Sequence, residues 1–114
     1  MKVLKDPGQV LQIMGRKLNE LRKKFDEADG EEASEISGQE VAIIDLAGDI
    51  RHAIEDHGYF GVEDMARVYE YAAETKRSAH EYSNPRTTWY MKGLAKGATW
   101  ARVGLEDRMM EGQS

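Results

Sequence analysis

Three aspartates and one histidine recur at helical spacing in the middle of the chain: Asp45, Asp49, His52 and Asp56. Steps of four, three and four residues place these side chains on one face of a helix. Carboxylate and imidazole groups can bind a divalent cation, or act as general base and acid, so a metal-dependent nucleotide hydrolase is one alternative. This face lies opposite Ile43 and Ile50, however, which favours a solvent-exposed polar surface. We therefore expect no resident metal and no cofactor.

A lysine within an apolar stretch suggests a second kind of site, which would hold an anionic ligand. Lys76 follows Ala72 and Ala73 on the expected inward stripe of its helix, and His80 comes about one turn later. Small side chains beside a cation leave room for a phosphate group. A lysine on a core stripe can also extend its ammonium group to water, and this interpretation is favoured. The residues of the alternative, a site for a nucleotide-like ligand, are Lys76, His80, Tyr82, Arg86 and Lys92.

Two tryptophans and three glycines share one face of the last expected helix: Trp89, Gly93, Gly97, Trp100 and Gly104. The apolar stripe of the same helix lies on another face, so this helix has two packing surfaces. Glycine inside a helix costs about 1 kcal/mol relative to alanine, and glycines four residues apart let a second backbone approach closely. Tryptophans outside the core stripe are common anchors of interfaces.

Three occupants could fill this face: another helix of the same chain, a second copy or partner helix, or a planar ligand stacked on a tryptophan. Because four amphipathic helices already bury their own stripes, we expect docking by a second copy or by another protein. The expected partner-binding residues are Trp89, Gly93, Lys96, Gly97, Trp100 and Gly104.

Length and composition limit the class of protein. The chain has 114 residues and a net charge of −5, which predicts one domain and disfavours general nucleic-acid binding. It has no cysteine, so disulfides, thiolate catalysis and cysteine-bound zinc are excluded. No apolar run approaches the length of a membrane span or a signal sequence. We expect a cytoplasmic protein that is not bound to a membrane.

Four amphipathic helices are expected to position these residues. Pro7 and Pro85 each follow an Asp or Asn that can cap a helix, so two helices should begin there. The first should end at Asp29–Gly30, before an acidic connector at 30–37. Ser37 and Glu40 match a capping box for a second helix that ends near Gly58, and the third and fourth should span 62–82 and 84–110. Strand patterns are nearly absent. The sequence thus predicts a single all-α domain, an antiparallel four-helix bundle that oligomerises.

The functional expectation follows from the two-faced last helix. We expect a non-enzymatic binding protein that self-associates and docks on, or inhibits, a macromolecular partner. The small, acidic, cysteine-free and all-helical composition resembles that of bacteriophage accessory proteins. This resemblance is one of overall style and implies action by occupying another macromolecule. A nucleotide-like small-ligand binder is the main alternative, and the metal-dependent hydrolase is the weaker one.

Overall fold

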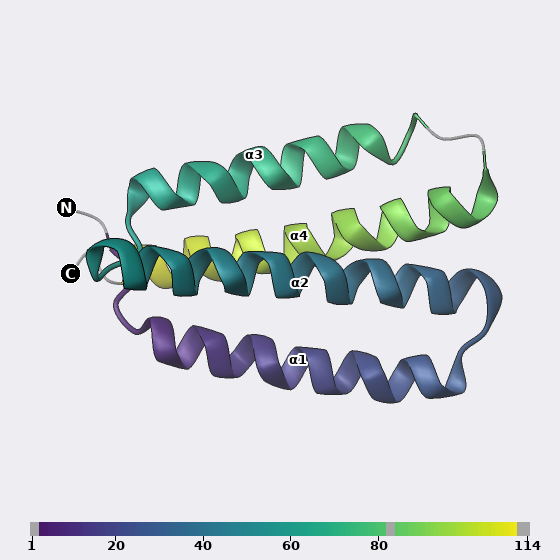
Figure 1. Ribbon diagram of the computed structural model, residues 1–114, viewed down its shortest axis with the longest axis horizontal. Helices are drawn as coiled ribbons and strands as arrows, with labels where there is room; N and C mark the ends of the chain where they lie inside the picture. Colours follow the sequence, from purple (N-terminus) through teal and green to yellow (C-terminus); the bar gives the residue numbers. More distant parts are fainter. Residues whose placement is uncertain (1–2, 82–83, 112–114) are drawn as a thin grey trace.

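The computed structural model describes residues 3–81 and 84–111. Within them the chain is all-helical and forms four helices without a β-strand, as the sequence predicted. The helices, shown in Figure 1, are α1 (Pro7–Glu27), α2 (Gly30–His57), α3 (Val62–Ser78) and α4 (Pro85–Glu111).

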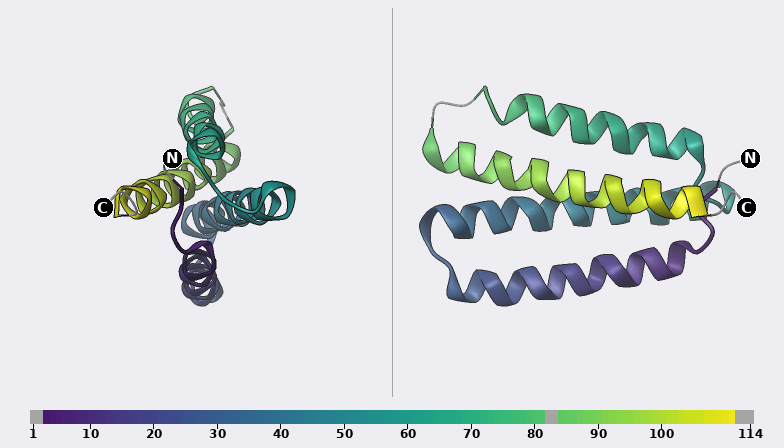
Figure 2. Two further views of the ribbon diagram at one scale, coloured as in Figure 1. Left: turned by 90° about the vertical axis from the view of Figure 1, so that its left-hand side faces the viewer. Right: turned by 180° about the vertical axis from the view of Figure 1, so that it is seen from behind.

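The four helices pack side by side, and each runs back along the one before it (Figure 1). The end-on view in Figure 2 shows α2 and α4 in the centre, with α1 and α3 on opposite sides of this pair. The helices α2 and α4 therefore point in the same direction. One flank of α4 faces away from the other three helices (Figure 2).

Small residues set the distance between α2 and α4. A Cβ added at Gly38 would lie 2.6 Å from the Leu94 backbone nitrogen, and one added at Gly97 would lie 2.6 Å from the Gln39 carbonyl oxygen. The two backbones thus meet where side chains would otherwise separate them. Ala42 and Ala98 are fully buried beside this crossing, so the closest packing in the molecule is built from glycine and alanine.

Capping residues account for several helix ends. The Asp6 carboxylate accepts a hydrogen bond from the Gln9 backbone N–H at 3.0 Å, and the Asn84 side chain accepts one from Arg86 at the start of α4. Gly58 adopts φ 87° at the end of α2, a left-handed conformation that glycine enters without strain. The helix starts at Pro7 and Pro85 and the helix end at Gly58 agree with the sequence prediction.

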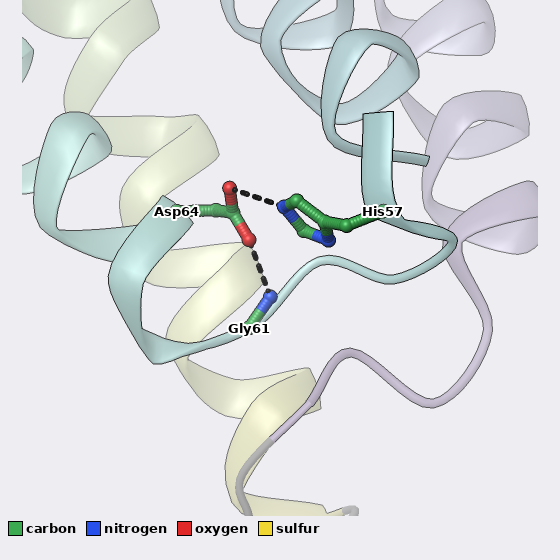
Figure 3. A network of polar contacts seen from close by, with 3 residues as sticks. All are labelled: His57, Gly61 and Asp64. Carbon is green, nitrogen blue, oxygen red and sulfur yellow. Dashed lines mark hydrogen bonds and ion pairs between the residues drawn. The ribbon is translucent and has the colours of Figure 1, made fainter. Parts of the chain in front are cut away.

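The turn between α2 and α3 is fixed by the network in Figure 3. The Asp64 carboxylate accepts a hydrogen bond from the Gly61 N–H at 2.9 Å and contacts His57 Nε2 at 3.2 Å. The same turn buries Phe60 completely, and its carbonyl accepts a hydrogen bond from the Leu4 N–H at 2.7 Å. The N-terminal segment is thereby joined to the α2–α3 turn.

The acidic connector predicted at 30–37 is wrong, because α2 begins at Gly30 and includes it. Ser37 is thus an interior residue, and the expected capping box with Glu40 does not start the helix. Packing explains the extra turns: Ile36 is 5% exposed and Gly38 lies against α4. Glu31, Glu32 and Ala33 are good helix formers, and burial of the following residues against α4 stabilises the helix further.

Candidate functional site

The exposed flank of α4 carries a stripe of mixed chemistry. Steps of seven, four, three and four residues place its members on one side of the helix, and we call them the tryptophan stripe: Trp89, Lys96, Trp100, Val103 and Asp107. Trp100 keeps 36% of its surface exposed and Val103 keeps 42%, whereas Trp89 is half-buried. Large apolar side chains thus remain accessible at the centre of this stripe.

The glycines expected beside the tryptophans separate into two groups. Gly93 and Gly97 are buried, and a Cβ at Gly93 would lie 2.6 Å from the Glu35 carbonyl carbon of α2. The close approach is confirmed, but the neighbour is a helix of the same chain. The expectation that a partner fills the groove is therefore wrong for these two glycines. Gly104 is different, since it is exposed and a Cβ there would meet no atom within 4 Å.

Charged neighbours surround the tryptophan stripe. Lys96 forms an ion pair with Glu35 of α2, although its side chain remains 63% exposed. The Lys17 ammonium of α1 lies 5.7 Å from the centre of the Trp100 ring, within the range of a cation–π contact. Beside that ring, a shallow apolar hollow between α1 and α4 is lined by Ile13 and Gly104, among others.

The residues of the nucleotide-like ligand alternative are exposed wherever the structure describes them. Lys76 and Ala73 are exposed, so their expected place on the inward stripe of α3 is wrong. His80 is likewise exposed, as are Arg86 and Lys92, and Tyr82 lies outside the described residues. Lys76 and Ala73 are exposed because α3 lies at the outside of the bundle and packs mainly on α4. The buried stripe of α3 is therefore narrower than the sequence predicted.

The structure does not bring the four residues of the acidic face of α2 together as metal ligands. Within residues 3–81 and 84–111, no three His, Asp or Glu side chains are placed to hold a metal ion. His52 and Asp56 are exposed. Asp45 instead accepts a hydrogen bond from the Tyr71 hydroxyl of α3 at 2.8 Å. The hydrolase alternative therefore gains no support from the geometry of these four residues.

Asp49 differs from its neighbours on this face. It is half-buried, and this burial raises the pKa of its carboxyl group above the usual 3.8, an effect that nearby Arg67 opposes and Asp45 increases. Ionised Asp49 is therefore disfavoured in the folded state relative to the unfolded chain. Its contribution to stability is most favourable below pH 3.8 and is lost as the pH rises through the raised pKa.

Asp49→Asn is accordingly expected to increase the free energy of unfolding at pH 7, because it removes a carboxylate that folding desolvates. At pH 3.5 the gain should disappear, since both states of the wild-type side chain are then largely protonated. Urea unfolding monitored by circular dichroism at the two pH values measures this difference. Asp56→Asn, at an exposed position of the same face, is the control, and equal effects of both variants would contradict the interpretation.

One feature was missed by the sequence interpretation. A hollow of about 280 Å³ lies between α3 and α4, and its lining includes Tyr71 and Glu74 of α3 and Met91 and Leu94 of α4. The only clue to this hollow in the sequence is that Tyr71 and Glu74 are three residues apart, which places them on the same face of a helix. This spacing is common on any helix and so does not identify a site. Their position beside Asp45 depends on packing between helices far apart in sequence.

Two further findings concern the whole chain. No helix among the described residues is both long enough and apolar enough to cross a membrane. Comparison with protein-family models, with curated proteins and with solved structures finds no match to this chain. The functional interpretation therefore rests on the residues themselves.

Proposed function

We propose that this protein is a non-enzymatic helical binding protein that self-associates through the tryptophan stripe and docks on a macromolecular partner as an oligomer. The observation that carries the proposal is Trp100, which keeps 36% of its surface exposed although Lys17 of α1 lies beside its ring. Covering the rest of such an indole contributes about 2 kcal/mol in each copy.

The chemistry of the tryptophan stripe favours a second copy as its occupant. When two copies of a helix pack antiparallel about a two-fold axis, each residue of one copy faces a residue of the other, and the two residue numbers add up to the same value along the whole helix. An axis between Trp100 and Val103 sets Trp100 against Val103 of the second copy. The same axis sets Lys96 against Asp107 of the second copy. Apolar side chains then meet at the centre and opposite charges meet on both sides, so the stripe is complementary to itself when reversed.

The accessibility of the charged ends supports this arrangement. Asp107 is exposed, and the Lys96 side chain is 63% exposed despite its ion pair with Glu35. A lysine ammonium group has three donors and can contact both carboxylates at once. The ion pair with Glu35 restricts the Lys96 side chain before association, so less side-chain entropy is lost when a second copy binds.

The absence of cysteine from the chain allows a direct test by disulfide cross-linking. Lys96→Cys combined with Asp107→Cys is expected to give a covalent dimer under mild oxidation, because the two positions face each other across the axis. Each single variant should remain uncross-linked, since the same position in the two copies lies about 16 Å apart. Non-reducing electrophoresis measures the dimer, and light scattering measures the mass of the unmodified protein.

Two results would contradict the proposal. If either single variant cross-links as fast as the double variant, the antiparallel register is wrong. If light scattering gives the monomer mass throughout the range from 1 µM to about 1 mM, self-association itself is excluded, because a Kd above 1 mM corresponds to less than about 4 kcal/mol.

A further inference from the structure

A second surface lies on the other side of α4, where the hollow between α3 and α4 opens beside α2. Its apolar floor is formed by Met91 and Leu94, both half-buried. Its volume of about 280 Å³ is just below the roughly 300 Å³ at which small-molecule pockets begin, so it suits one long side chain. Methionine adapts its shape to such an occupant.

The polar groups that line this hollow are one carboxylate and several hydroxyls. Glu74 lines it with an exposed carboxylate, and the Tyr71 hydroxyl on the same wall donates a hydrogen bond to Asp45 at 2.8 Å. Burial and the neighbouring Asp45 carboxylate both raise the pKa of Tyr71, so this phenol remains a neutral donor. The Thr75 hydroxyl already donates its hydrogen to the Ala72 carbonyl at 2.9 Å, so toward a ligand it can act only as an acceptor. The hollow thus combines an apolar floor with negative charge at its edge.

We propose that this hollow binds an arginine or lysine side chain from a basic segment of a partner protein. The aliphatic stem of such a side chain covers Met91 and Leu94, while its cationic head reaches the Glu74 carboxylate. The Tyr71 ring provides an aromatic surface beside the same cation, and the Asp45 bond fixes the position of this ring. The net charge of −5 attracts a basic segment over a longer range.

This surface is independent of the tryptophan stripe. Met91 and Leu94 line the hollow on the α3 side of α4, whereas Trp100 lies on the α1 side of α4, beside the Lys17 ammonium group. A monomer and a dimer therefore present the same hollow. Failure of one proposal leaves the other intact.

The test uses a fluorescein-labelled ten-residue peptide of alternating arginine and alanine, with binding measured by fluorescence anisotropy in 0.15 M salt. Glu74→Gln is expected to weaken binding about fivefold, the upper range for a partly exposed ion pair. Glu70→Gln is the matched control, since it removes the same charge from an exposed position one turn earlier on α3 and outside the hollow. It should change the Kd less than twofold.

A second pair of variants tests the hollow itself. Ser78→Phe fills the space beside Met91 and should abolish binding, whereas Ala73→Phe adds the same ring to an exposed position of α3 and should not. Circular dichroism verifies that both variants remain helical. Equal weakening by Glu74→Gln and Glu70→Gln would overturn the proposal, because binding would then depend on net charge alone. Unchanged binding by folded Ser78→Phe would overturn it as well.

Discussion

Gly93→Ala is expected to lower the free energy of unfolding by about 3 kcal/mol, although the change adds one methyl group. A Cβ at this position would lie 2.6 Å from the Glu35 carbonyl carbon and 2.9 Å from the Glu35 Cα. Both are backbone atoms, so no side chain can rotate away. The helices α2 and α4 must separate instead, and the buried residues between them lose contact. Urea unfolding followed by circular dichroism measures the loss.

Gly104→Ala provides the matched control on the same helix. A Cβ there meets open space, and alanine is favoured over glycine inside a helix by about 1 kcal/mol. This variant is therefore expected to be more stable than the wild-type protein. The same substitution at two positions eleven residues apart should thus have opposite signs. Similar effects at both positions would mean that helix propensity, and not the approach of α2, determines the result.

Phe60→Ala is expected to have a still larger effect, a loss of about 4 kcal/mol in the free energy of unfolding. Phe60 is fully buried although it belongs to a short turn, and it packs within the hydrophobic core. Its removal leaves a cavity, since the turn is held by the Asp64 bond to Gly61 and by the Leu4 bond to Phe60 itself.

Tyr59→Ala is the comparison within the same turn, because Tyr59 is 36% exposed and contacts His57 at 4.2 Å between ring centres. Tyr59→Ala should lower the free energy of unfolding by less than about 1 kcal/mol, as expected for a position at the surface. Thermal unfolding of the two variants measures the difference. Comparable losses would indicate that the aromatic pair at the surface, and not the core, stabilises this turn.

Helix boundaries that depend on local chemistry could be predicted from the sequence. Asp6–Pro7, Asn84–Pro85 and Gly58 each carry their own signal, because capping involves atoms only a few residues apart. The start of α2 could not be found in this way. Asp29, the residue before this helix, makes no side-chain capping hydrogen bond, and the packing of Gly38 against α4 is evident only in the folded chain.

For the candidate site, the sequence predicted that part of α4 is approached closely, but not which helix approaches it. Gly93 and Gly97 indicated a close approach that the structure shows, whereas Gly104 did not, and the spacing in one helix does not identify its neighbour. Gly38 supplies the matching small residue on α2, and its importance is evident only when the two helices are placed together. Trp100 keeps its partial exposure beside Lys17 of α1, a neighbour that the spacing within α4 does not identify either.

The central α2–α4 pair has a consequence for the folding rate. Its closest contact joins Glu35 to Gly93, which are 93 − 35 = 58 residues apart in the chain. Helical proteins fold fast when neighbouring helices meet first, because short chain segments close with little loss of entropy. Here the chain segment between the two residues, which includes α3, must close before this contact can form. Folding of this chain is therefore expected to be slow for an all-helical domain of its size.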